Sequence, residues 1–157
     1  MIKFSVSRVE KEVVFLEGSE PASFWALPEN DTYTPETPVS YELTVKSVAG
    51  SILVTGRVSG RVSAACGRCL QALEMEISND AVELYYAKDE IREEELDITE
   101  EIREELLIEL PMNPLCSSDC KGLCPVCGVN RNKKECHCSR QGNLAWSALD
   151  NIITEEK

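Results

Sequence analysis

Residues 39–77 read VSYELTVKSVAGSILVTGRVSGRVSAACGRCLQALEMEI. Apolar side chains occupy every second position of residues 39–45, as one face of a half-buried strand requires. The pair Ala49-Gly50 is suited to a tight turn, and the alternation then resumes over residues 52–64. This pattern predicts two long antiparallel strands joined by a short turn.

The same alternation continues outward, over residues 73–77 and 82–86, which predicts further strands. Gly56 and Gly60 fall on the apolar face of the second long strand, where a missing side chain permits a bend or bulge. We therefore predict an α+β protein whose body is an antiparallel β meander with a barrel-like form.

An acidic helix is predicted at about residues 99–110. Ile102 and Leu106 recur at a spacing of four, which gives an apolar stripe that can pack on the sheet. Thr99 is suited to cap the start of this helix, and Pro111 ends it.

The length of 157 residues suffices for one ordinary hydrophobic core with a small appendage. We predict three regions. Residues 1–115 form the antiparallel β body with its acidic helix, residues 116–140 form a cysteine-rich module, and residues 141–157 form a short C-terminal helix.

Eight cysteines are the strongest chemical signal in the sequence. A C-x-x-C turn lets two thiolates face one ion, and tetrahedral zinc takes four ligands at about 2.3 Å. We predict that the cysteines bind structural zinc, as two ions with four cysteines each. The predicted ligands are Cys66, Cys69, Cys116, Cys120, Cys124, Cys127, Cys136 and Cys138.

Two groupings of these cysteines are open. The more compact one places one ion between Cys124, Cys127, Cys136 and Cys138, and the other between Cys66, Cys69, Cys116 and Cys120. The alternative joins Cys116, Cys120, Cys124 and Cys127 and leaves the last pair for the hairpin. His137 could replace a neighbouring cysteine, although we expect it to face solvent.

No apolar run approaches the roughly 20 residues of a membrane-spanning helix, and the N-terminus lacks the pattern of a secretory signal. We therefore expect a cytoplasmic protein without membrane contact, in which clustered thiols bind metal rather than form disulfides.

The sequence shows no catalytic constellation and no Gly-rich phosphate loop. We predict that it is not an enzyme and has no small-molecule substrate.

The net charge of −12 argues against a broad electrostatic grip on nucleic acid. Residues 116–140, however, hold five basic and two acidic side chains and could contact RNA phosphates. The possible RNA contacts are Arg57, Arg61, Arg68, Lys121, Arg131, Lys133 and Lys134. A basic protein could instead meet the acidic helix by complementary charge, through Glu101, Glu104 and Glu105.

Several motifs together resemble the YceD family, the large ribosomal RNA subunit accumulation proteins. They are CGRCL at residues 66–70, the helix end Leu110-Pro111, and PLCSSDCKGLCPVCG at residues 114–128. The continuation to residue 138 is similar to Gram-positive-type members, whereas residues 141–143 depart from the Asp-Pro segment common in the family.

The resemblance implies a non-enzymatic accessory role in bacterial ribosome biogenesis, supporting processing or accumulation of the 23S ribosomal RNA precursor. The implied partner is that RNA, or a basic ribosomal or assembly protein. Two other classes remain open, namely a metal-stabilised protein-interaction adaptor outside the ribosome pathway and a thiol redox protein. Labelling of thiols separates the last class, because zinc-bound thiolates resist reagents until the ion is removed.

Overall fold

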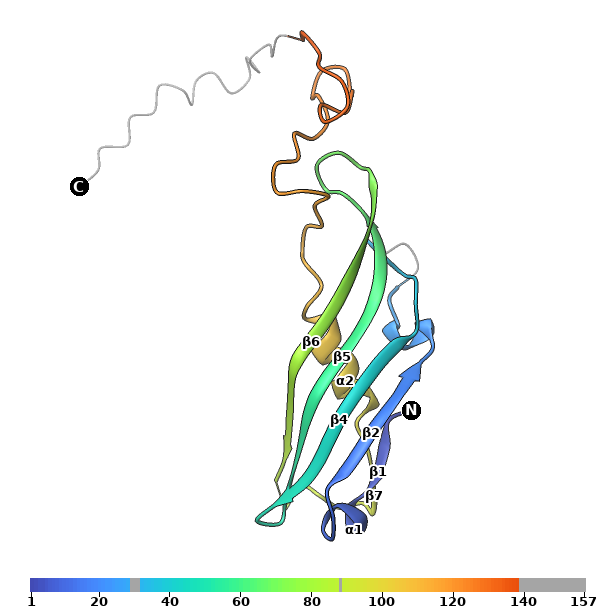
Figure 1. Cartoon of the computed structure of the whole chain (residues 1–157), viewed down its shortest axis with the longest axis vertical. Helices are drawn as coiled ribbons and strands as arrows, with labels where there is room; N and C mark the ends of the chain where they lie inside the picture. Colours follow the sequence, from blue (N-terminus) through green and yellow to red (C-terminus); the bar gives the residue numbers. More distant parts are fainter. Residues whose placement is uncertain (29–31, 88, 139–157) are drawn as a thin grey trace, which may run out of the picture.

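The computed structural model describes residues 1–28, 32–87 and 89–138. Its largest element is a five-stranded antiparallel sheet, in which β4, β5 and β6 follow one another as a meander. β2 pairs with the other edge of β4, and β3 pairs with β5 beyond the end of β4. The strands, which lie side by side in a long twisted ribbon (Figure 1), are β2 (Val14–Glu20), β3 (Tyr33–Pro35), β4 (Val39–Val48), β5 (Ser51–Ala65) and β6 (Ala72–Tyr86).

This sheet is open, so the barrel-like part of the predicted fold is wrong. Within the described residues, β2 and β6 are the two edges and do not pair with each other. The strand β3 is only three residues long and pairs with the same edge of β5 as β4 does, beyond the end of β4. It therefore cannot close the sheet. The α+β class and the antiparallel meander are confirmed.

The alternation of residues 52–64 decides which face of the sheet is buried. From Ile52 to Ala64 every second residue of β5 is buried except the half-buried Gly56, and the intervening Arg57 and Arg61 are exposed. Behind this inner face, the 3-10 helix η1 (Ala22–Trp25) places the fully buried Trp25 against Gly60. A Cβ on Gly60 would lie 2.8 Å from the Trp25 ring, so only glycine leaves room for the indole.

The helix α2 (Thr99–Leu107) packs against β6 through Ile102 and Leu106, both of which are fully buried. It is shorter than predicted, because residues 108–110 form turns. A small antiparallel sheet of β1 (Lys3–Ser5) and β7 (Glu95–Asp97) lies at its start, and the short helix α1 (Val6–Val9) follows β1.

Thr99 does not cap α2 as predicted, since the side chain at its N-cap position, Ile98, makes no capping hydrogen bond. The Thr99 hydroxyl accepts a hydrogen bond from the Ile2 backbone N–H at 2.8 Å and donates one to Asp97 Oδ1 at 2.5 Å. The threonine therefore ties the start of the helix to the N-terminal strand.

The β5–β6 hairpin extends past the other strands, and the chain after α2 runs back to its tip (Figure 1). This path brings residues 116–138 to the same end of the molecule as the pair Cys66 and Cys69. The predicted C-terminal helix at residues 141–157 lies outside the described residues, and the boundaries of the three regions remain predictions.

Candidate metal centre

The first four-cysteine group forms where the hairpin tip meets the returning chain. Its four Sγ atoms lie within 4.8 Å of one another, with Cys66 and Cys120 at 3.9 Å and Cys69 and Cys116 at 3.6 Å. Cys66, Cys69 and Cys120 are buried beside Leu73 and Leu115, whereas Cys116 is exposed. We refer to these four cysteines as site 1.

Arg68 joins the hairpin tip to the returning chain. Its guanidinium donates to the carbonyl oxygens of Ser118 at 3.1 Å and Cys120 at 3.2 Å. Its own carbonyl accepts a hydrogen bond from the Leu123 N–H at 3.0 Å, and the neighbouring Gly67 N–H donates to the Pro114 carbonyl at 2.8 Å. These bonds fix the two chain segments that supply the site 1 thiols.

The second group, site 2, is built from one short segment. Cys124, Cys127, Cys136 and Cys138 also have their Sγ atoms within 4.8 Å of one another. Only Cys124 is buried, while Cys127 and Cys138 are exposed. The sequence-based prediction of the more compact grouping matches this arrangement, and the alternative grouping is not the one that the structure forms.

Both groups could hold a metal ion, and the distances in site 1 fit a tetrahedral one. A metal–sulfur distance of about 2.3 Å places two sulfurs of a tetrahedron about 3.8 Å apart, and the two Sγ–Sγ distances quoted for site 1 lie on either side of that value. Asn132 also donates its Nδ2–H to Cys120 Sγ at 3.2 Å, an outer hydrogen bond of the kind that orients a ligating thiolate. Four soft sulfur ligands select zinc over magnesium or calcium.

Backbone N–H groups make one cysteine in each site easier to ionise. The Cys116 N–H beside Cys66 lowers the pKa of that thiol to about 6, and the Cys127 N–H lowers the pKa of Cys124 to about 6. Hydrogen bonding to Cys120 raises the pKa of Cys116 to about 12, and hydrogen bonding to Cys127 raises the pKa of Cys138 to about 12. A cation held between the four sulfurs would balance the negative charge of the thiolates that bind it.

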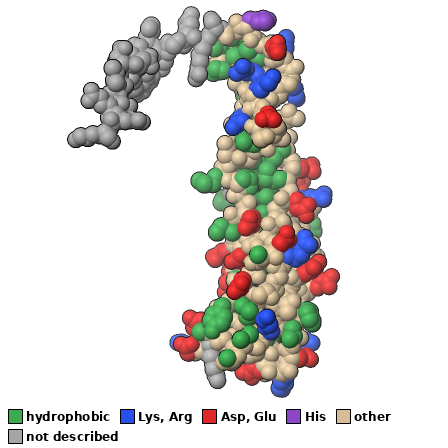
Figure 2. Space-filling model, turned by 60° about the vertical axis from the view of Figure 1, so that its left-hand side comes forward, with side chains coloured by type: hydrophobic (Ala, Val, Ile, Leu, Met, Phe, Trp, Pro, Cys, Tyr) green, Lys and Arg blue, Asp and Glu red, His purple; other side chains and the backbone are tan. Residues whose placement is uncertain are grey.

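The four predicted RNA contacts in the tail are all exposed. They gather around the metal sites, where Figure 2 shows Lys and Arg side chains at one end of the molecule. Two hydrogen bonds hold this loop: the Lys121 backbone N–H donates to Asn132 Oδ1 at 2.8 Å, and the Arg131 backbone N–H donates to the Gly122 carbonyl at 2.9 Å. The four exposed side chains are Lys121, Arg131, Lys133 and Lys134.

The three arginines proposed as further RNA contacts are in different situations. Arg68 is held by the two carbonyls that its guanidinium contacts. Arg57 and Arg61 lie on the outer face of the sheet, opposite Glu42 and Glu76 in the strand register. Since carboxylates neighbour both of them, the sheet offers no basic surface that continues the one on the tail.

Two of the three acidic residues predicted to meet a basic protein face the sheet instead. Glu105 accepts a hydrogen bond from Asn79 Nδ2 at 2.8 Å. Burial and then the charge of Glu101 raise the pKa of the Tyr86 hydroxyl, which places Glu101 near that strand. Glu104 alone of the three is exposed.

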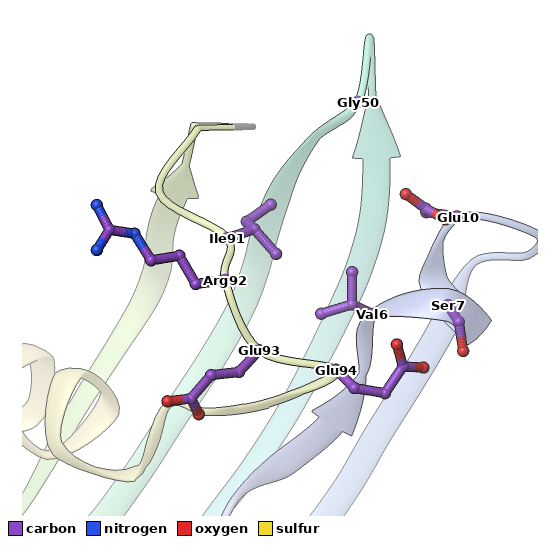
Figure 3. Close-up of a pocket in the computed structure, with 8 residues that line it drawn as sticks. All are labelled: Val6, Ser7, Glu10, Gly50, Ile91, Arg92, Glu93 and Glu94. Atoms are coloured by element: carbon purple, nitrogen blue, oxygen red, sulfur yellow. The ribbon is translucent and has the colours of Figure 1, made fainter.

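A shallow hollow lies at the opposite end of the molecule from the cysteines. In Figure 3, Val6 and Ile91 point into it and Glu10 and Glu94 stand at its rim, while Arg92 points away. The residues that line this hollow include no cysteine and no histidine. No helix in the described part of the chain has the length and apolar character needed to cross a membrane.

An open antiparallel sheet with two four-cysteine groups at the end of its longest hairpin defines a small protein with two candidate metal sites. Residues 54–153 match the family described as Large ribosomal RNA subunit accumulation protein YceD. The chain belongs to the YceD family, as its cysteine motifs indicated.

Proteins of bacteria and of plants are similar to this chain. An uncharacterised protein of Mycobacterium tuberculosis (strain ATCC 25618 / H37Rv) is 32% identical over 128 residues, which are 73% of this chain and 62% of that protein. A protein of Arabidopsis thaliana, named large ribosomal RNA subunit accumulation protein YCED homolog 1, chloroplastic, is 43% identical over 47 residues, 30% of this chain and 15% of its own. The chain thus spans 62% of the length of the mycobacterial relative. No solved structure matches it.

Proposed function

We propose that this protein is a non-enzymatic accessory factor in bacterial ribosome biogenesis, which acts in the cytoplasm and supports processing or accumulation of the 23S ribosomal RNA precursor. The family match over residues 54–153 is the observation that carries this proposal. Plant relatives in Arabidopsis thaliana and Zea mays bear the same functional name.

Zinc has a structural role in this proposal. Each bound ion supplies the positive charge that keeps four thiolates together. Site 1 then fixes residues 114–123 against the hairpin tip, where the backbone bonds to Gly67 and Arg68 already hold them. The end of the protein that holds the cysteines then has a fixed shape. It carries the segment with Lys121, Arg131, Lys133 and Lys134, which we call the basic loop.

Contact with RNA is proposed for that basic loop. Within residues 116–138, four exposed basic side chains outnumber the two acidic residues Asp119 and Glu135. The acidic body repels phosphates, so only this end can approach RNA, and the number of phosphate contacts stays small. This arrangement favours a specific encounter over general retention on nucleic acid.

The cellular role is tested by deleting the gene from its bacterial host and measuring the ratio of 23S precursor to mature 23S RNA. We expect less mature large-subunit RNA, restored by the wild-type gene and not by a Cys66→Ser variant. An unchanged ratio in the deletion strain contradicts the proposed role.

The RNA contact is tested separately, by replacing Lys121, Arg131, Lys133 and Lys134 with alanine. We expect the variant to keep its metal and its fold and to lose association with the precursor RNA at physiological salt. The matched control replaces Arg57 and Arg61, which lie on the other part of the surface. Unchanged association in the tail variant rules out the basic loop as the RNA contact.

A basic protein partner is the second candidate, because residues 1–115 hold 23 acidic and 10 basic residues. The exposed Glu104 is the best point of contact on α2. Reversing its charge together with Glu101 and Glu105 removes a co-purifying protein if this candidate is correct. An unchanged set of co-purifying proteins excludes it.

A further inference from the structure

The two cysteine turns share one backbone geometry, and the residue that follows the second cysteine differs between them in a way that matters. In site 1 the Leu70 N–H donates to the Cys66 carbonyl at 2.9 Å, and in site 2 the Gly128 N–H donates to the Cys124 carbonyl at 2.8 Å. Both residues directly follow the second cysteine of their turn. Both adopt a left-handed backbone, with φ of +57° for Leu70 and +72° for Gly128.

Leucine is an unfavourable choice at this position. Glycine adopts a left-handed backbone freely, whereas the Cβ of leucine crowds the following carbonyl oxygen. Packing does not account for the choice, since 66% of Leu70 is exposed. The sulfurs of site 1 are covered by Leu73 and Leu115 instead. A strained residue whose side chain contacts little in its own chain is a sign of a functional position.

The surroundings of Leu70 indicate the kind of partner. The carbonyl of the nearby Arg68 accepts the Leu123 N–H, and a Cβ on Gly122 would lie only 3.0 Å from that same oxygen. Lys121 is therefore held beside the hairpin tip, and the Arg131 N–H bonds to Gly122 from the other side. An exposed apolar side chain thus projects from the basic end of the molecule.

Unpaired RNA combines the two matching features, because it has phosphates for the basic loop and unstacked bases whose faces an apolar side chain can contact. A protein partner is a poorer match, since leucine is under-represented among the residues that dominate protein interfaces. A duplex is also a poorer match, because its bases are stacked and its A-form major groove is narrow.

We propose that Leu70 is the point at which this protein contacts an unstacked base of single-stranded RNA, while the basic loop contacts the flanking phosphates. The proposal rests on the RNA contact proposed above and adds the feature of the RNA that is recognised. It assigns the residue at the hairpin tip to ligand binding rather than to the metal site.

The test compares wild type, Leu70→Gly and Leu70→Met, each with its full metal content. The probes are a fluorescein-labelled single-stranded RNA of mixed sequence and the same RNA annealed to its complement. We expect Leu70→Gly to weaken single-stranded binding by about tenfold and to leave duplex binding unchanged. Leu70→Met keeps an apolar side chain and should bind within about twofold of wild type.

A second measurement separates this role from a structural one. Leu70→Gly removes backbone strain, so its melting temperature and metal content should stay at or above the wild-type values. With 2-aminopurine in the single-stranded RNA, saturating wild type should change the fluorescence as the base leaves its stack, and Leu70→Gly should not. A lower melting temperature with unchanged RNA binding identifies Leu70 as a structural residue and overturns the proposal.

The remaining outcomes tell this proposal apart from the proposed function. If the four-alanine loop variant loses RNA and Leu70→Gly does not, the leucine contact is wrong and the RNA function stands. If wild type binds neither probe, both fail together. If Leu70→Gly loses a co-purifying protein while RNA binding persists, the tip docks a protein and the base contact is overturned.

Discussion

Sites 1 and 2 each consist of four cysteines, but they connect different parts of the chain. Site 1 draws its cysteines from the sheet and from the tail, 47 residues apart in the case of Cys69 and Cys116, and three of its four cysteines are buried. Site 2 takes all its ligands from residues 124–138, and one of the four is buried. Similar coordination can therefore join distant parts of a chain or shape a single loop.

The largest difference should appear when one ligand is removed from each site. Cys66→Ser breaks the link between sheet and tail, and we expect a loss of one metal ion with a fall in melting temperature of roughly 10 °C or more. Cys138→Ser should also lose one ion but shift the melting temperature of the sheet by less than about 3 °C. Native mass spectrometry and calorimetry measure both, and equal shifts in the two variants would contradict the distinction.

Two glycines give a finer comparison. Gly122 and Gly128 both have left-handed backbones, with φ of +70° and +72°, but a Cβ on Gly122 would meet the Arg68 carbonyl at 3.0 Å, while one on Gly128 would meet no atom within 4 Å. We expect Gly128→Ala to cost about 1 kcal/mol and Gly122→Ala about 2 kcal/mol in free energy of unfolding. Denaturant titration measures the two values. Equal costs would mean that the close approach at Gly122 contributes nothing.

Arg68→Lys tests the clamp over site 1. Lysine keeps the positive charge but lacks the planar guanidinium whose Nη1 donates to both carbonyl oxygens, so we expect a loss of about 1 kcal/mol. Amide hydrogen exchange should become faster at residues 117–121 and stay unchanged at site 2. Arg61→Lys, on the outer face of the sheet, is the control, and protection equal to wild type in Arg68→Lys would refute the clamp.

The smallest effect is expected at His137. It lies between two site 2 ligands but is exposed and belongs to neither ligand group in the described structure. His137→Asn should keep the metal count of wild type and change the free energy of unfolding by less than about 0.5 kcal/mol. Loss of an ion in this variant would make the histidine a ligand.

Local patterns were sufficient to predict much of this fold. The period of two places β4 and β5 correctly, because each has one buried and one exposed face. The two alternating stretches at residues 73–77 and 82–86 belong to one continuous strand, β6, so the prediction of separate strands there is wrong. The grouping of the cysteines also follows from spacing, since ligands close in sequence form the compact site. The acidic helix is also predicted from a local pattern, the apolar residues at a spacing of four. The observed helix ends at Leu107, about one turn earlier than predicted.

Features that depend on distant residues could not be read from these patterns. Whether the sheet closes depends on pairing between its edge strands, which no local period encodes. Thr99 is a residue type that often caps helices, but its hydroxyl accepts a hydrogen bond from the backbone N–H of Ile2, which is 97 residues away in the sequence. In the sequence, nothing indicates a partner for the Arg68 side chain. In the fold, the chain after α2 returns to the hairpin tip and supplies the two carbonyl oxygens to which Arg68 donates.

The separation of Cys69 and Cys116 has a consequence for synthesis of the chain. Cys66 and Cys69 are synthesised first. The other two ligands of site 1 begin with Cys116, which follows Cys69 by 47 residues. Since β6 and α2 lie between the two halves, both elements are already available to fold when the fourth ligand arrives. Site 1 can therefore bind metal through all four cysteines only after the body has been synthesised, whereas the four ligands of site 2 follow one another within a single short segment.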